Sequence, residues 1–210
     1  MGLSLFSAPT DEPVSLIEAK QHCRIDSTDD DGLLAGYILA ARSWAEDYTR
    51  RAFMTQTWDY RIDASIASGE SVSGWPEVKV GSACYQRIHL PKPPLISVTS
   101  ITYVDSNGVS QTLAADQYLV NAYSIEGIID PAYGVTWPSV RRQMNAITVR
   151  FVCGYGANPG TGQELDRIRQ AILLTVGHWY ENRESVNVGN IVTEVPQAAE
   201  MLLFPLRVFY

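Results

Sequence analysis

Residues 163–183 contain the feature that most constrains the fold of this chain. Apolar side chains recur there every three or four positions, and charged or polar residues fill the intervening positions, which predicts an amphipathic α-helix. The apolar stripe consists of Leu165, Ile168, Ile172, Val176 and Trp179. Thr161 can cap this helix together with Glu164, and Arg183 stands near its C-terminal end, where the helix dipole favours a cation. A helix of this length spans about 30 Å, so the rest of the domain has to pack against it.

A second long helix is predicted over residues 30–50, again from apolar residues at helical spacing. Its face consists of Leu34, Tyr37, Ile38, Ala41, Trp44, Ala45 and Tyr48. Ser15 and Glu18 form the pattern of a capping box, which predicts a short helix that runs to about Cys23. Near the other end of the chain, Pro196 can begin a short helix that runs to about Leu203. Helices are therefore expected from both ends of the chain.

The acidic stretch between the first two helices, residues 26–32, suggests a calcium-binding loop. The register that places Gly32 at the sixth position of such a loop places Ser27 at the first and Ile38 at the twelfth, where a bidentate Glu is required. The register therefore fails at both ends. We expect these carboxylates to cap and complement the N-terminus of the second helix instead.

The middle of the chain has the pattern of short strands. Apolar and polar residues alternate around Trp58 and again around Val149, and the sequence at 105–108, DSNG, predicts a hairpin turn. Residues 67–82 are predicted to form a loop and residues 1–13 a loose arm. Strands and helices do not alternate, so the predicted fold class is α+β, with a helical core from the N- and C-terminal helices and an antiparallel β insertion in the middle.

The expected organisation is a single subunit over residues 1–210. It comprises N-terminal helices (1–54), a β-rich insertion (55–153), and a long helix with a C-terminal tail (154–210).

The composition restricts the possible partners. The formal net charge is −7, which argues against a surface that grips nucleic-acid phosphates. The three cysteines are scattered, without a C-x-x-C pair, so neither a disulfide framework nor a thiolate metal site is expected. No apolar run is long enough to cross a bilayer. We expect a soluble protein with no membrane partner.

Motifs for catalysis or cofactor binding are weak or absent. Gly154 and Gly156 resemble the start of a dinucleotide fingerprint, but Pro159 stands where its third glycine belongs. None of the three histidines is spaced to share a metal with a second ligand. The aromatic residues Trp75, Trp137, Trp179 and Tyr180 could form a stacking platform for sugars or bases, although such residues more often form cores and protein interfaces. No catalytic residue, metal or cofactor is predicted, and the chain is not expected to be an enzyme.

Six sequence blocks, each present once, follow one another along the chain. They are LIEAKQHCRID, the acidic turn after it, AARSWAEDYTRRAFMTQTW, IHLPKPPLISVTSITYVDSNG, AYGVTWPSVRRQMNAITVRFVCGYG and AILLTVGHWYENRE. Together they resemble the head-tail connector (adaptor) proteins of long-tailed bacteriophages and prophages, in the variety with a β-rich insertion between its helices. The resemblance covers residues 14–208, with 67–82 and the final FPLRVFY as its least similar parts.

The resemblance implies a structural virion protein without catalysis. Such adaptors form a ring, usually dodecameric, beneath the portal protein, where they extend the DNA channel and dock the next neck or tail protein. DNA would pass through this channel without specific binding. The expected location is the virion neck, and the host cytoplasm during assembly. The resemblance also implies that the C-terminal segment reaches the portal through Phe204, Leu206, Val208, Phe209 and Tyr210.

A ring needs two different complementary faces on each subunit, and the charged faces of the two long helices could supply them. The basic residues are Arg50, Arg51, Arg167, Arg169 and Arg183, and the acidic ones are Asp29, Asp30, Asp31, Glu46 and Glu184. Ordinary solvated helix surface would have the same pattern. Removal of residues 203–210 is expected to leave folding intact and to abolish portal attachment.

Two other functions fit parts of the pattern. The first is a different neck component, a stopper or a tail terminator, whose usual architecture is dominated by β-structure. The second is a phage carbohydrate-binding or hydrolytic domain that uses the β insertion and its tryptophans.

Overall fold

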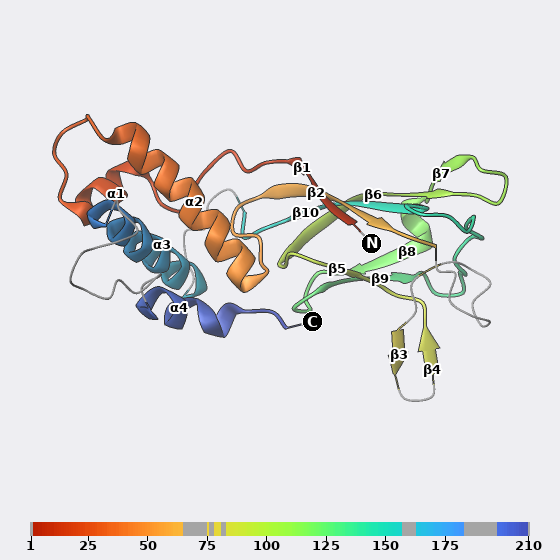
Figure 1. The fold of residues 1–210 in the computed structure, drawn as a ribbon. Coiled ribbons are helices and arrows are strands. Elements are labelled where there is room, and N and C mark those ends of the chain that lie inside the picture. Colours follow the sequence, from red (N-terminus) through yellow and green to blue (C-terminus); the bar gives the residue numbers. More distant parts are fainter. Residues whose placement is uncertain are drawn as a thin grey trace. The chain divides into compact units, whose positions relative to one another are not determined.

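The structure is a computed structural model that describes residues 2–64, 75, 78–80, 83–156, 163–182 and 197–209 (Figure 1). The chain divides into two compact units. The β unit comprises Met1–Ala8 and Thr55–Tyr155, and the helical unit comprises Pro9–Met54 and Gly156–Tyr210. The predicted α+β class is confirmed, and the chain passes from one unit to the other three times.

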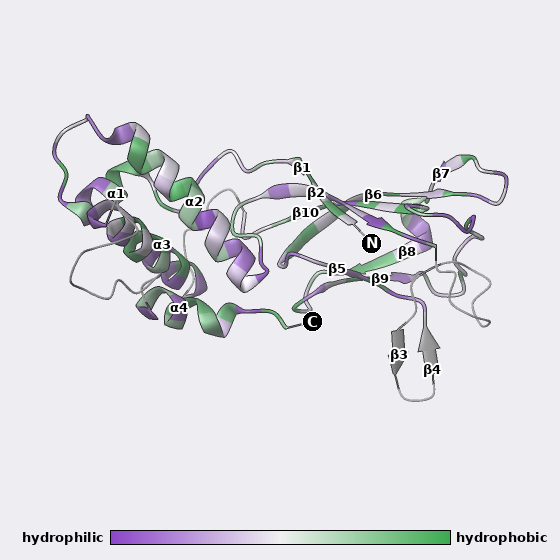
Figure 2. Ribbon diagram, viewed as in Figure 1, coloured by the Kyte–Doolittle hydropathy of each residue, from purple (hydrophilic) through white to green (hydrophobic). Residues whose placement is uncertain are grey.

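Four α-helices form the helical unit within the described residues. They are α1 (Leu16–Cys23), α2 (Asp31–Thr49), α3 (Gln163–Glu181) and α4 (Gln197–Leu203), and a 3-10 turn, η2 (Phe204–Leu206), follows α4. The capping box at the start of α1 is confirmed, because the Ser15 hydroxyl accepts the Glu18 N–H while the Glu18 carboxylate accepts the Ser15 N–H. Figure 2 shows apolar and polar residues mixed along α2 and α3, as expected for amphipathic helices.

The predicted apolar stripes of α2 and α3 lie largely in the core. Leu34, Ile38, Leu165, Ile168, Ile172 and Val176 are buried. The aromatic members of the stripes are half-buried and pack on other rings. Trp44 stacks on Tyr48 at a centroid distance of 5.6 Å, and Trp179 meets the edge of Tyr37 at 6.0 Å.

Polar contacts also join α1, α2 and α3, which lie far apart in the sequence. Glu18 of α1 pairs with Arg169 of α3, and Lys20 of α1 pairs with Asp31 of α2 at 2.7 Å. The expectation that the acidic stretch caps α2 is wrong for Asp30, which makes no capping hydrogen bond with its side chain. Its carboxylate accepts a hydrogen bond from the Tyr180 hydroxyl of α3 at 2.7 Å instead, because α3 brings this half-buried donor next to it. Thr161 and Arg183, the predicted cap and dipole partner of α3, lie outside the described residues.

The β unit contains three antiparallel sheets in the described part of the chain. The largest has the order β1-β2-β10-β6-β7, formed by Gly2–Ser7, Gln56–Ile62, Ile147–Cys153, Leu95–Val104 and Ser110–Thr112. The second has the order β5-β9-β8, formed by Ile88–Leu90, Gly127–Pro131 and Tyr118–Asn121, with η1 (Ala115–Gln117) before β8. The third pairs β3 (Val78–Val80) with β4 (Ala83–Tyr85).

Two sequence-based expectations for this unit are wrong. Residues 2–7 form an edge strand paired with β2 rather than part of a loose arm, because Leu3 and Leu5, on either side of Ser4, have the period-two spacing of a strand. Val78–Val80 is a strand inside the stretch predicted as a loop. The hairpin turn at 105–108 is confirmed, with Gly108 at φ 85° between β6 and β7.

The faces of the large sheet differ in character. Ile147, Val149 and Phe151 of β10 are fully buried on one face. On the other face Arg150 donates two hydrogen bonds to Asp59 of β2, at 2.7 and 2.9 Å, and its guanidinium lies 3.4 Å from the centre of the Phe6 ring. The alternation around Trp58 predicts Asp59 on the solvent side, yet Asp59 is buried, because the arginine of the neighbouring strand satisfies its charge.

We predict that Asp59→Asn lowers the free energy of unfolding by about 1–3 kcal/mol at neutral pH, because it removes charge-assisted hydrogen bonds. The hydrogen bonds from Arg150 lower the pKa of Asp59 and outweigh burial, which raises it; the charges of Arg150 and Arg61 also lower it. A depressed pKa in the folded state means that this contribution is complete above the unfolded pKa and is lost as the pH falls through the folded pKa.

The difference between wild type and Asp59→Asn should therefore shrink below about pH 4. Urea unfolding across this pH range measures it, and Asp116→Asn, at an exposed acid of the same unit, is the control. A difference that stays constant down to the lowest pH would contradict the assignment.

Candidate docking surface

The C-terminal segment is held against the C-terminal end of α2. The Val208 N–H donates to the Thr49 carbonyl at 3.0 Å, and Arg51 Nε donates to the Leu206 carbonyl at 2.6 Å. Leu203, Leu206 and Val208 are buried. The last turn of the chain is therefore part of the folded unit and not a free tail.

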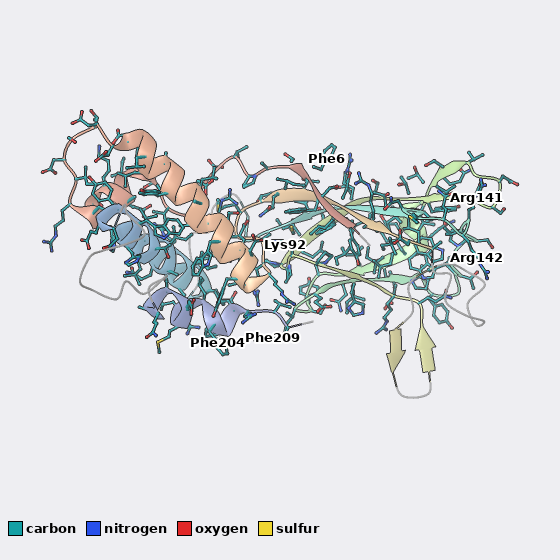
Figure 3. The ribbon with its side chains drawn as sticks, in the orientation of Figure 1. Phe6, Lys92, Arg141, Arg142, Phe204 and Phe209 are labelled. Atoms are coloured by element: carbon teal, nitrogen blue, oxygen red, sulfur yellow. The ribbon has the colours of Figure 1, made fainter. Side chains whose placement is uncertain are left out.

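Between these buried positions the segment presents large apolar side chains to solvent. Phe204 is 57% exposed and Phe209 is 67% exposed, and Met201 of α4 is also exposed. Figure 3 shows the two phenylalanines beside each other at the C-terminal end, and their rings meet edge to face at 6.3 Å. Met201, Phe204 and Phe209 are called the C-terminal patch below.

Arg207 supports this patch. Its guanidinium carbon lies 5.2 Å from the centres of both the Tyr48 and the Phe209 rings, and such cation–π contacts stabilise the rings on either side. Arg207 Nε is buried and has no hydrogen-bond partner among the described residues. An unsatisfied donor beside exposed aromatic rings is a feature that a bound partner can complete.

The structure separates the five residues that the resemblance assigns to the portal contact. Phe204 and Phe209 point outward, whereas Leu206 and Val208 pack into the subunit's own core. Tyr210 lies outside the described residues. Removal of residues 203–210 would take three buried side chains, Leu203, Leu206 and Val208, out of the core, so we now predict that this deletion destabilises the subunit.

A largely buried polar network joins the two ends of Pro9–Met54, the first stretch of the helical unit. Arg42 of α2 donates to Glu12 at 2.6 Å and to Glu46 at 3.0 Å. The other Glu46 oxygen accepts the Phe53 N–H at 2.7 Å. Sequence reasoning missed this network and the roles of Arg51 and Arg207, and only the i, i+4 spacing of Arg42 and Glu46 signals any part of it.

A hollow of about 500 Å³ lies along α1 and α3 and is lined by His22, Cys23, His178 and Glu181 among others. Burial raises the pKa of the Cys23 thiol, and the charge of Glu181 raises it further, so the thiol stays protonated at neutral pH. Within the described residues, no group of three or more His, Cys, Asp and Glu is placed to hold a metal ion. The described lining of the hollow therefore offers a protonated thiol and no cluster of three metal-ligating side chains.

The tryptophans of the β unit are placed in the core. Trp75 and Trp137 stack at 4.3 Å with an interplanar angle of 13°, both are buried, and their ring N–H groups donate to the carbonyls of Pro138 and Gln86. Buried rings cannot stack on a sugar. The platform that the carbohydrate-binding alternative requires is therefore not formed by this pair.

The described helices include none with the length and apolar character needed to span a membrane.

Comparison with known proteins relates this architecture to viral connectors. Residues 13–78 match the family model of phage gp6-like head-tail connector proteins. The match covers α1, α2 and β2 and confirms the resemblance seen in the sequence for that stretch. No curated protein matches the chain.

Solved structures match the fold of the whole chain. The neck of an empty GTA particle computed with C6 symmetry contains a chain with a TM-score of 0.73 and 21% identity, over 100% of this chain and 97% of that chain. The virion of a native gene transfer agent particle gives a TM-score of 0.72 at 21% identity with the same coverage. The neck of a native GTA particle computed with C12 symmetry gives 0.71 at 20% identity, also with the same coverage. The chain therefore shares the fold of these neck proteins.

We predict that Leu206→Ala lowers the free energy of unfolding by about 2–5 kcal/mol, because it leaves a cavity in the core. Phe204→Ala, its matched control two residues away, should change stability by no more than about 0.5 kcal/mol. Chemical denaturation of both variants measures the difference. Equal losses would mean that the exposed ring also belongs to the core.

Trp137→Ala should lower the free energy of unfolding by about 3–5 kcal/mol, because Trp137 is buried against Trp75. Tyr133→Ala, at a fully exposed ring of the same unit, is the control and should unfold like wild type. A Trp137→Ala protein of unchanged stability that had lost binding on a glycan array would instead revive the carbohydrate-binding alternative.

Proposed function

We propose that this chain is a structural head-tail connector that forms a ring beneath the portal protein of a phage-like particle. The observation that carries the proposal is the fold likeness to GTA neck chains over the full length of this chain, together with the connector family match at residues 13–78. The ring extends the DNA channel and docks the next neck or tail protein. It acts in the virion neck, after assembly in the host cytoplasm, and without catalysis.

The proposed ring is dodecameric in the virion. The C12 symmetry of one matching neck supports this copy number by analogy. The two 19-residue helices, α2 and α3, favour a connector over a stopper or tail terminator, in which β-structure dominates.

Charge is divided unequally between the two units of the subunit. The helical unit carries 15 Asp and Glu against nine Lys and Arg, whereas the β unit carries eight against seven. A mainly acidic unit repels a passing duplex and does not hold it. The proposal therefore has DNA move through the ring without specific binding.

The C-terminal patch is the proposed contact with the portal. Aromatic and methionine side chains are enriched in protein interfaces, and Phe204 and Phe209 are exposed at the end of a segment whose backbone is fixed at Thr49 and Arg51. A fixed backbone lowers the entropy lost when the two rings bind. In this proposal Leu206 and Val208 orient the patch and do not touch the portal.

The test is the double variant Phe204→Ser/Phe209→Ser. We expect it to weaken binding to the cognate portal protein about tenfold or more, since buried aromatic anchors dominate interface energies. Its melting temperature should stay near that of wild type, because both rings are exposed in the subunit. Surface plasmon resonance on immobilised portal measures the affinity, and negative-stain images report ring formation.

Ile17→Ser is the matched control, since Ile17 is an exposed apolar residue on α1 of the same unit. It should bind portal like wild type. Unchanged binding by the double variant would remove the portal role of the patch. A wild-type chain that neither binds portal nor forms rings with it would overturn the connector function itself.

A further inference from the structure

In the described part of the chain, β1 and β8 are edge strands of the β unit, and each stands at the end of a row of core side chains that no further described strand covers. In the second sheet, Ile88, Ile129 and Val120 occupy one cross-strand row from β5 through β9 to β8. Ile88 and Ile129 are fully buried, but Val120 is 41% exposed. An apolar side chain that faces the core and remains half open is a position that one more strand would cover.

The large sheet has the same feature at β1. Phe151 of β10, Trp58 of β2 and Leu5 of β1 are cross-strand neighbours. Phe151 is fully buried, Trp58 is half-buried, and Leu5 is 47% exposed. Burial therefore falls along the row toward the edge, as it does toward β8.

Neither edge carries the charged side chains or prolines that keep many edge strands from pairing. Natural edges are blunted by charged side chains, prolines or bulges, or are very short. The sequences of β1 (GLSLFS) and β8 (YLVN) contain no charged residue and no proline; β1 has one irregularity, between Leu5 and Ser7. By contrast, β7 (SQT) is polar, and β5 has three residues and is followed by Pro91.

The hairpin after β8 enlarges the apolar surface. Tyr123 and Ile125, between β8 and β9, are both exposed. The acids of the following strand segment are already paired, Glu126 with His89 and Asp130 with Arg87, each at 2.8 Å. The surface around β8 therefore matches an uncharged apolar partner rather than a charged one.

We propose that the β8 edge of one copy pairs with the β1 edge of the next copy and joins the sheets of neighbouring subunits in the ring. This inference rests on the proposed ring function. A ring requires two different surfaces on each subunit that fit each other, and β1 and β8 are two different uncharged edges of a single compact unit (Figure 1). The added strand places Leu5 of one copy beside Val120 of its neighbour and completes both rows.

Electrostatics favours this unit for the contact. The helical units carry most of the negative charge of the chain, so neighbouring helical units repel one another. The β unit is close to neutral. Its edge strands β1 and β8 contain no charged residue, so pairing them brings no like charges together. Backbone hydrogen bonds and apolar burial between β units then supply the attraction, as in β-strand addition.

The first experiment mixes two single-site variants, Leu5→Cys and Val120→Cys, each with Cys23 and Cys84 replaced by serine. Cys153 is buried and stays in place. Rings are assembled on portal and exposed to a mild oxidant. We expect a disulfide-linked dimer on non-reducing gels from the mixture but not from either variant alone, because opposite residues on paired strands are close enough to form a disulfide.

Each outcome has a definite meaning. Cross-links confined to the mixture support the pairing of β1 with β8. Rings visible by negative stain without cross-links overturn the pairing and leave the connector function intact. The absence of rings for the wild-type chain with portal overturns the connector function and the pairing with it.

The second experiment compares Val120→Lys with Val109→Lys. Val109 has the same side chain, is 54% exposed, and belongs to the same unit beside the β6–β7 turn. A lysine at the end of the core row should reduce ring yield at least tenfold, whereas the control should assemble like wild type. Both variants should keep the wild-type melting temperature.

An equal loss in both variants would attribute the defect to added charge and overturn the proposal. Normal rings from Val120→Lys would overturn it as well, and rings that form but fail to bind the next neck protein would reassign the β8 edge to that partner.

Discussion

Arg42 holds together the place where the chain enters the helical unit and the place where it leaves. The guanidinium joins Glu12, before α1, to Glu46 on α2, and Glu46 in turn holds the backbone of Phe53. A buried ionic network of this kind is costly if any member lacks a partner and specifies one geometry when all are satisfied. The chain enters the helical unit after β1 and leaves it before β2, and these two strands pair in the large sheet.

The parts of the fold that depend on local sequence could be predicted. Periodicity identifies α2 and α3 and their buried stripes, and the capping box marks the start of α1 within one residue. The DSNG turn identifies the hairpin of β6 and β7. In each case the physical cause lies within a few residues of the element itself, where side-chain spacing and turn chemistry can be read directly.

The parts that depend on distant partners could not be predicted. Asp59 is buried because Arg150, 91 residues away, neutralises it, and the alternation of the strand alone suggests the opposite face. The sequence suggests that Leu206 and Val208 belong to an apolar tail, whereas in the structure they are core residues. Their backbone is held by Thr49 and Arg51, which are more than 150 residues away in the sequence. For the candidate surface, sequence reasoning names the segment that carries the C-terminal patch but not which of its side chains remain exposed, because that depends on the core that covers the others.

The order of the segments has a consequence for biosynthesis. During translation α1 and α2 leave the ribosome early, yet the helix that completes their core follows only after the whole β unit. The hydrogen bond from Val208 to Thr49 forms only after α3 and α4 have been made. Chains cut short by premature termination or proteolysis would thus lack both the late helix and the aromatic cluster beside Arg207. In the proposed connector, truncated copies of this kind could not close the helical core and would be excluded from the ring without a separate inspecting factor.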